Sequence, residues 1–229
     1  MRACQAADLW RTECRVIDSL GFHSGRVLDV GCNQGVFLES MGEDWEKHGV
    51  ELARPLADIA RGKGIRVYDQ PVEDCRFPDS FFDVITMYAL IEHLRDPRLV
   101  INEISQALRP GGLLVIMTGA RNSLKARCKG QSWHMYCPPI HLWFFTHRSL
   151  VLLIEQFGFK ETSSRYTSGT MPWYISGCLA GKALDFVEKQ VVKRLFEHPP
   201  LWRVPLYDHL YLYALKEVHP HTLTHSEHR

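Results

Sequence analysis

The sequence predicts an α/β fold with an open, doubly wound and mostly parallel sheet. Short apolar runs rich in β-branched residues alternate along the chain with segments whose apolar residues recur at helical spacing. Residues 26–30 have the pattern of a buried strand and lead into a glycine-spaced turn followed by a helix. Residues 208–216 alternate in the way that is typical of an antiparallel strand, which we place last in the sheet.

The chain is expected to begin with a helix over residues 3–20. Ala6, Trp10, Cys14 and Ile17 fall on one stripe of that helix before Gly21 interrupts the pattern. Packing of the helix against the sheet is sufficient to explain this stripe.

The turn after the first strand is the most informative segment for function. Gly31 and Gly35 bracket a loop between the carboxyl end of a strand and the amino end of a helix, where open α/β sheets bind nucleotide-like ligands. The spacing from Asp29 is D-x-G-x-x-x-G, which differs from the dinucleotide fingerprint G-x-G-x-x-G. Asn33 stands where a middle glycine is usual, and asparagine tolerates a positive φ. An ordinary turn between strand and helix is the alternative.

A second strand over residues 48–51 ends in an acid, Glu51, twenty positions after Gly31. A carboxylate at this place can accept hydrogen bonds from both hydroxyls of a ribose. A Rossmann dehydrogenase predicts the same acid, so an NAD-dependent oxidoreductase remains an alternative at this point.

The remaining elements follow from local signals. A helix is expected to begin at Pro55 and to end at Gly62 and Gly64. A second is expected to begin at Asp96 and Pro97. A third is expected to be capped by Thr146 and to end at Gly158. Pro110, Gly111 and Gly112 are expected to end the second of these helices. Further strands are predicted at residues 65–68, 82–87, 113–117 and 159–168.

Three motifs carry a family resemblance. The loop from Asp29 to Gly35, the IEHL segment at 91–94 and LRPGGLLVIMTG at 108–119 resemble class I S-adenosylmethionine-dependent methyltransferases. The bacterial small-molecule enzymes of the ubiquinone-pathway and sugar-modifying groups are the most similar. The resemblance implies the Rossmann-like fold of that class, with seven strands and an antiparallel last strand, and S-adenosyl-L-methionine as cofactor.

The resemblance also implies a set of cofactor contacts. Pro71 takes the place of the acid that commonly meets adenine in related enzymes, so we expect the backbone near Val72, or Glu73, to border the ring instead. An exposed acidic turn is the alternative for Glu73. The full set expected at the cofactor is Asp29, Gly31, Cys32, Asn33, Gly35, Glu51, Leu52, Val72, Glu73 and Tyr88.

Two histidines are candidates for the general base. His93 in IEHL matches a residue that lies near the transferred methyl in the family, and imidazole titrates near neutral pH. His141 is the second candidate. It lies in an aromatic segment, W-x-x-x-x-P-P-x-H-L-x-F-F-T, which either packs over the sheet edge or walls an apolar pocket. A packing role is the alternative for His141.

The same resemblance bears on metal binding. Ubiquinone-pathway enzymes carry E-x-x-E-H at the position of IEHL and bind a divalent metal with it. Ala89 stands at the first acid of that motif, so no metal is expected.

Composition narrows the class of substrate and the compartment. A formal net charge of +1 lacks the basic footprint of nucleic-acid binding, so a small-molecule acceptor is expected, methylated at a hydroxyl oxygen. Seven cysteines without a C-x-x-C pair indicate free thiols and a cytoplasmic location. No apolar run is long enough to span a bilayer. The sequence leaves the oligomeric state open, and a non-catalytic partner protein that binds S-adenosylmethionine is a further alternative.

The expected organisation is one core with additions. Residues 1–24 form an N-terminal helix or cover, 25–168 the cofactor-binding core, and 206–218 its final strand. Residues 169–205 form a helical insertion or lid, in which the basic side of 175–195 leaves peripheral membrane contact open. The histidine-rich tail, 219–229, is expected to be disordered.

Overall fold

The computed structural model describes residues 2–167 and 208–218, with side chains from residue 9 onward. The insertion predicted at 169–205, with its segment 175–195, and the tail predicted at 219–229 lie outside the described residues.

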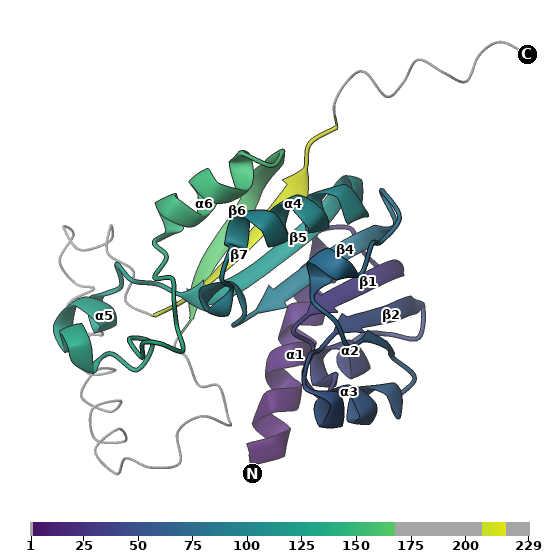
Figure 1. Cartoon of the computed structure of the whole chain (residues 1–229), viewed down its shortest axis with the longest axis horizontal. Coiled ribbons are helices and arrows are strands. Elements are labelled where there is room, and N and C mark those ends of the chain that lie inside the picture. The colour runs from purple at the N-terminus through teal and green to yellow at the C-terminus, as the bar shows by residue number, and fades with distance from the viewer. Residues whose placement is uncertain (1, 168–207, 219–229) are drawn as a thin grey trace, which may run out of the picture.

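The described chain forms one seven-stranded sheet in the order β3-β2-β1-β4-β5-β7-β6 (Figure 1). The first five strands along the chain run parallel, and β7 lies antiparallel between β5 and β6. The predicted mostly parallel, seven-stranded sheet with an antiparallel last strand is confirmed. The strands are β1 (Gly25–Val30), β2 (Trp45–Val50), β3 (Arg66–Tyr68), β4 (Phe82–Tyr88), β5 (Leu108–Gly119), β6 (Phe159–Thr167) and β7 (His209–Lys216).

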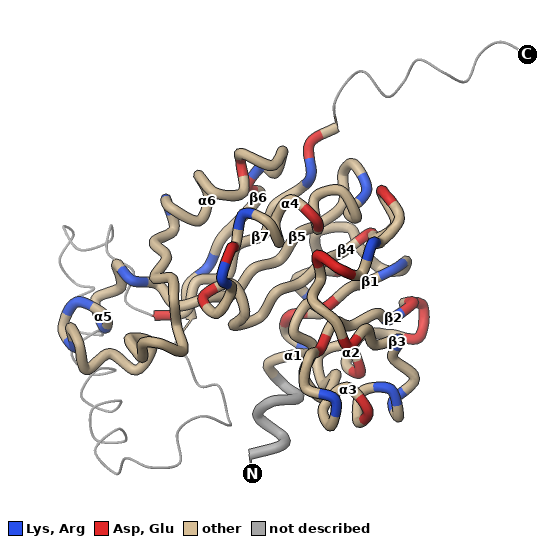
Figure 2. Tube along the Cα trace, in the orientation of Figure 1, with Lys and Arg blue, Asp and Glu red and all other residues tan. Residues whose placement is uncertain are grey.

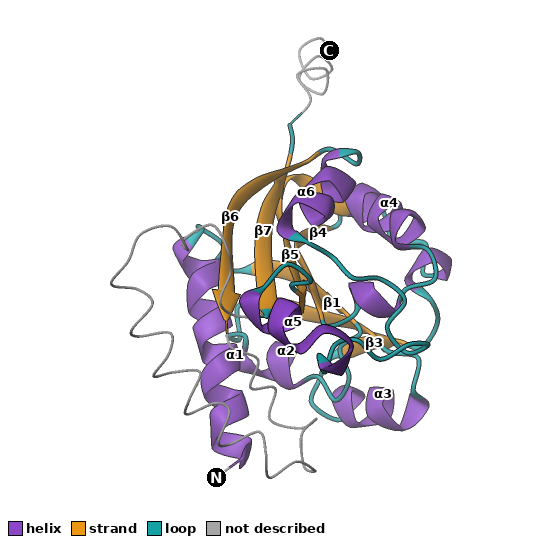
Figure 3. Cartoon of the chain, turned by 90° about the vertical axis from the view of Figure 1, so that its left-hand side faces the viewer, coloured by secondary structure: helices purple, strands orange, loops and turns teal. Residues whose placement is uncertain are grey.

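Helices cover both faces of the sheet, as the doubly wound prediction requires. Helices α1 (Arg2–Ser19), α2 (Val36–Ser40) and α3 (Arg54–Arg61) lie on one face, and α4 (Pro97–Ala107) and α6 (His147–Glu155) lie on the other (Figures 1 and 3). The short α5 (Leu124–Lys129) follows the carboxyl end of β5. Single 3-10 turns occur at η1 (Val72–Asp74), η2 (Ile91–His93) and η3 (Gly130–Ser132).

Two apolar clusters, one on each face, form the core. Successive side chains of a strand point to opposite faces, so each central strand contributes to both clusters. Leu28, Ile85 and Leu114 pack with α4 and α6. Their neighbours Val27, Val84 and Leu113 pack with α1, α2 and α3. Burial on both faces explains why these strands are continuous apolar runs in the sequence.

Two of the predicted helix starts, at Asp96 and Thr146, are confirmed by their caps. The Asp96 side chain accepts hydrogen bonds from the backbone N–H groups of Arg98 and Leu99, at 2.9 and 3.2 Å. Thr146 and Ser149 form a reciprocal capping box at the start of α6.

The predicted end of α4 is wrong by a few residues. Pro110, Gly111 and Gly112 do not end the helix, because it stops at Ala107 and the chain enters β5 at Leu108. Leu108 pairs with Phe82, and the register shifts before Leu113 pairs with Val84. Pro110 and the glycines therefore belong to an irregularity within β5, where Gly111 takes a φ of 71°.

Charges of both signs are interspersed along the described chain (Figure 2). Helix α5 differs, because its charged residues, Lys125, Arg127 and Lys129, are all basic. Among the described helices, none has the length and apolar character needed to cross a bilayer.

We predict that Gly35→Ala destabilises the fold more than Gly64→Ala. Both glycines have a positive φ, 72° and 80°, which costs an L-residue about 1–2 kcal/mol. A Cβ at Gly35 would also lie 2.3 Å from Ile65 Cδ1, whereas a Cβ at Gly64 would meet nothing within 4 Å. Overpacking should add about 1–3 kcal/mol at Gly35 alone. Urea unfolding measures both free energies, and equal losses would contradict the packing role of Gly35.

Candidate functional site

The carboxyl ends of β4 and β5 concentrate unsatisfied buried polar atoms. Among the described residues, Tyr88 Oη, Glu92 Oε1 and Asn122 Oδ1 are buried without a hydrogen-bond partner. Tyr88 ends β4, Glu92 lies in the turn that follows it, and Asn122 follows β5. Because buried polar groups are nearly always paired in native proteins, this edge of the sheet is where a ligand is expected.

The glycine loop lies at the same edge, next to the end of β2. The N–H groups of Gly31 and Cys32 both donate to the Val50 carbonyl, at 2.8 and 3.0 Å. Gly31 and Asn33 have φ values of 79° and 51°, so the expected left-handed loop is present. A Cβ on Gly31 would lie 3.1 Å from Leu90 Cδ1, in the turn after β4. The loop thus faces the turn that carries His93.

Gly35 has a different role from Gly31. It is the N-cap of α2, and the space that its Cβ would fill is taken by Ile65 and Ala60. The lack of a side chain at Gly35 lets α2 begin close to α3, so packing accounts for this glycine.

Glu51 is held in place from two sides. One of its carboxylate oxygens accepts from Asn33 N at 3.0 Å, and the other accepts from Ala53 N at 2.8 Å. Each oxygen keeps a second lone pair, so the carboxylate can still accept hydroxyl hydrogen bonds. The neighbouring Leu52 is 61% exposed and offers an apolar surface beside it.

Asp29 is a buried acid at the end of β1. Its Oδ1 accepts a 2.7 Å hydrogen bond from Thr86 Oγ1 on the adjacent strand β4. The pKa of Asp29 is raised to about 7, mainly because the side chain is buried. The hydrogen bond from Thr86 lowers this pKa, and the charge of Glu51 raises it further. A cation placed beside Asp29 would favour its ionised form.

The other residues expected at the cofactor differ in accessibility. Cys32 is buried, and burial with nearby acids raises the pKa of its thiol to about 12, so it is a packing thiol rather than a nucleophile. Val72 is buried in the cluster on the α4 side, whereas Glu73 is exposed. Tyr88 packs against Trp10 and Phe37, whose ring centroids each lie 4.9 Å from its own ring centroid.

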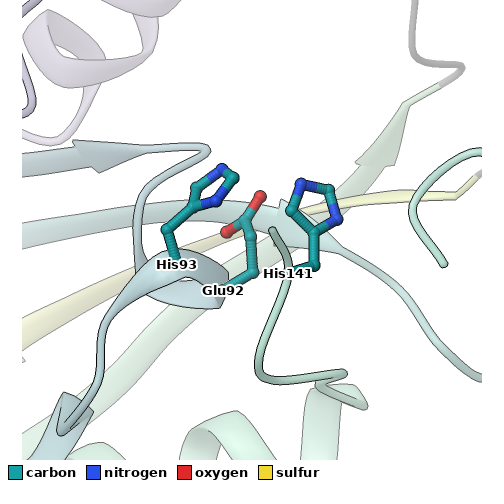
Figure 4. A group of neighbouring side chains, drawn as sticks. All are labelled: Glu92, His93 and His141. Carbon is teal, nitrogen blue, oxygen red and sulfur yellow. The ribbon is translucent and has the colours of Figure 1, made fainter. Parts of the chain in front are cut away.

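The two candidate bases lie together, although their positions in the sequence are far apart (Figure 4). Their ring centroids are 4.5 Å apart. His93 Nδ1 is 3.0 Å from the Ile140 carbonyl, and His141 Nδ1 is 2.6 Å from the Met135 carbonyl. Because a carbonyl only accepts, each Nδ1 is assigned as the N–H donor. Each Nε2 then carries a free lone pair.

Glu92 lies beside both histidines (Figure 4) and was missed by the sequence reasoning. It is 1% exposed, and its Oε2 accepts a 2.8 Å hydrogen bond from Thr118 Oγ1 on β5, whereas Oε1 has no partner in the described chain. The position of Glu92 in the sequence could have indicated its role. An acid that directly precedes His93 and follows the carboxyl end of a strand is expected to lie in the cleft. No sequence signal pointed to Thr118.

The aromatic segment 133–145 closes over this turn. The N–H groups of Leu142 and Trp143 donate to the Glu92 carbonyl, at 2.8 and 3.2 Å, and Trp143 Nε1 donates to the Leu94 carbonyl at 2.8 Å. The segment packs over the sheet edge, and the pocket that it encloses has almost no free space. That pocket is lined by Glu92, Thr118, Gly119, Trp133, Met135, His141, Trp143 and Phe144.

Comparisons with known proteins support one family. Residues 8–164, more than half of the chain, match the family model described as a methyltransferase domain. A ubiquinone biosynthesis O-methyltransferase of Idiomarina loihiensis is 32% identical over 110 residues, which are 44% of this chain and 45% of that relative. An uncharacterised protein of Methanocaldococcus jannaschii is 26% identical over 170 residues, which are 70% of this chain and 80% of that protein. The chain therefore spans less than half the length of the ubiquinone relative.

A solved structure supports the fold. It is an S-adenosylmethionine-dependent methyltransferase of Thermotoga maritima, described as a possible histamine N-methyltransferase. It superposes with a TM-score of 0.64 at 20% identity, and the match covers 91% of this chain and 89% of that one.

The raised pKa of Asp29 predicts a pH-dependent stability difference between the wild type and Asp29→Asn. From about pH 4 to pH 7 the folded state holds a proton on Asp29 that the unfolded state has lost, so this contribution to stability falls as pH rises. The Asn variant lacks the effect. Relative to the wild type, the free energy of unfolding of the Asn variant should rise on the order of 2 kcal/mol between pH 5 and pH 8. Urea unfolding at both pH values measures this, and a difference independent of pH would contradict the assignment.

Proposed function

This chain belongs to the class I S-adenosylmethionine-dependent methyltransferases, and on that premise we propose that it methylates a hydroxyl oxygen of a small molecule. The observation that carries the proposal is that the glycine loop and Glu51 lie at the same sheet edge as Glu92, His93 and His141. Glu51 alone is also compatible with an NAD-dependent oxidoreductase, but the match to a methyltransferase domain does not support that alternative.

The proposed cofactor contacts follow from the loop geometry. Asp29, through the loop that begins at Gly31, would orient the ammonium group of S-adenosyl-L-methionine, and Glu51 would accept the ribose hydroxyls. Leu52 and the chain around Val72 and Glu73 would border the adenine. The bound cofactor supplies a methyl group on a sulfonium, which is already a good leaving group. The protein is therefore required mainly to position the acceptor and remove one proton.

We assign the removal of that proton to His93, with His141 as the second candidate. The free Nε2 lone pair of either ring can take the proton of the acceptor hydroxyl while the oxygen forms its bond to the methyl carbon. The bond between that carbon and sulfur breaks in the same step, and the proton stays on the imidazole until solvent removes it.

The acceptor is proposed to be an apolar or aromatic molecule that carries a hydroxyl group. Trp133, Met135, Trp143 and Phe144 are the apolar side chains that lie beside Glu92 and His141. The pocket that they line has almost no free space, so an acceptor would have to displace part of this packing to enter it. Free cysteines such as Cys14 and Cys128 support a cytoplasmic location. The division into 1–24, 25–168, 169–205 and 206–218 is kept as part of the proposal.

Calorimetry with each cofactor tests the binding assignment. We expect S-adenosyl-L-methionine to bind and NAD not to bind. Glu51→Gln should weaken binding about tenfold to a hundredfold, because hydrogen bonds to a charged group contribute about 1.5–3 kcal/mol. Glu46→Gln is the matched control, since Glu46 is an exposed acid on β2, the strand that Glu51 follows, and it pairs with Arg26. Binding of NAD alone, or equal effects of the two variants, would contradict the assignment.

Transfer of a labelled methyl group tests the base. With a panel of phenols, catechols and sugars as acceptors, His93→Ala should lower kcat about 10²–10⁴-fold and leave the cofactor dissociation constant unchanged. His23→Ala is the control, because His23 is exposed and lies near Asp18 rather than at the site. A His93→Ala enzyme that turns over at the full rate would remove His93 from this role.

A further inference from the structure

We propose that Glu92, His93 and His141 together bind a divalent transition-metal cation. One ligand atom from each of these side chains can be chosen so that the three atoms all lie within 4.8 Å of one another. Two imidazole nitrogens and one carboxylate oxygen form a donor set that suits zinc, manganese or iron in the divalent state, and it leaves coordination positions open for other ligands.

The orientation of both histidines fits this role. Metal-bound histidines usually donate the other ring N–H to a carbonyl or carboxylate, which fixes the ring and directs the free nitrogen to the metal. His93 Nδ1 donates to the Ile140 carbonyl and His141 Nδ1 donates to the Met135 carbonyl. Both Nε2 atoms are left as the available donors.

Glu92 supplies an independent observation. It is almost fully buried, Thr118 holds its Oε2, and its Oε1 has no hydrogen-bond partner among the described residues. No described lysine or arginine forms an ion pair with Glu92. A buried carboxylate without a counter-charge is costly, and a cation bound at Oε1 would remove that cost.

The expectation of no metal depended on Ala89, which removes the first acid of the E-x-x-E-H motif. The structure brings His141 from a distant segment to the same turn, and this residue replaces the missing ligand. The N–H groups of Leu142 and Trp143, bound to the Glu92 carbonyl, fix the distance between the two segments. Three candidate ligands therefore lie at the same turn.

A second group of possible ligands, His134, Asp208 and His209, does not fit a cation. Asp208 Oδ2 accepts from Trp133 Nε1 at 3.0 Å, and Lys125 Nζ lies 3.5 Å from Asp208 Oδ1. The carboxylate already has a positive partner, so this group serves as the control site in the experiment.

The role of the cation rests on the proposed function, whereas its binding does not. A cation at the cluster would hold the acceptor oxygen and lower the pKa of its hydroxyl group. The hydroxyl proton would then leave to solvent, the oxygen would form its bond to the methyl carbon, and the carbon–sulfur bond would break. His93 and His141 would act as ligands in this case rather than as bases.

Titration of the full chain with Mn²⁺ alone tests the site. The electron paramagnetic resonance signal of the free ion measures how much Mn²⁺ remains unbound at each point. Glu92→Gln keeps the acceptor for Thr118 but removes the charge, and it should weaken the tightest site at least tenfold. His141→Ala should do the same. His134→Ala should leave that site unchanged, and binding to the histidine-rich tail is common to all variants. Unchanged binding in both Glu92→Gln and His141→Ala, or loss in His134→Ala, would overturn the proposal.

Mn²⁺ titration and cofactor calorimetry on the same protein distinguish a failure of the metal site from a failure of the proposed function. If Mn²⁺ binding depends on Glu92 and His141 but S-adenosyl-L-methionine does not bind in calorimetry, the metal site stands and the proposed function fails. If the cofactor binds and Glu92→Gln leaves Mn²⁺ affinity unchanged, the metal site fails and the proposed function stands.

Discussion

The site depends on two hydrogen bonds that meet at one carbonyl. The Glu92 carbonyl accepts the N–H groups of Leu142 and Trp143, and these contacts hold the aromatic segment against the turn after β4. Together with the hydrogen bond between His93 Nδ1 and the Ile140 carbonyl, they place His141 beside His93. The turn itself is fixed because β4 is a central strand, buried on both faces and paired with β1 and β5. A rigid strand end therefore positions a long connection that has little regular structure.

The cofactor side of the site is built by the same sheet. Strands β1 and β4 are parallel neighbours, so Asp29 and Thr86 are paired in register and their side chains meet at the carboxyl edge. Burial of the Asp29 carboxylate opposes folding when it is ionised, as its raised pKa indicates. Glu92 is a second buried acid at this edge. The structure thus tolerates local destabilisation at the place where a positively charged cofactor and a cation are proposed to bind.

Most of the fold could be predicted because its signals are local. The caps at Asp96 and Thr146 and the glycine loop after β1 depend on residues within one turn of each other. The end of α4 was misjudged at Pro110 because pairing between Leu108 and Phe82, a contact across the sheet, begins the strand earlier than the helix-ending residues suggest. The grouping of Glu92, His93 and His141 could not be predicted for the same reason. It requires contacts between segments that are far apart in the chain, and no local pattern specifies them.

A crystal structure of the chain grown with S-adenosylhomocysteine and Mn²⁺ would test the central claim most directly. The account predicts the ribose on Glu51, the sulfur at the end of β4, and anomalous density for manganese between Glu92, His93 and His141. It predicts that the arrangement of the 133–145 segment is kept. Cofactor bound away from the glycine loop, or a cluster that holds no manganese while the cofactor is in place, would contradict it.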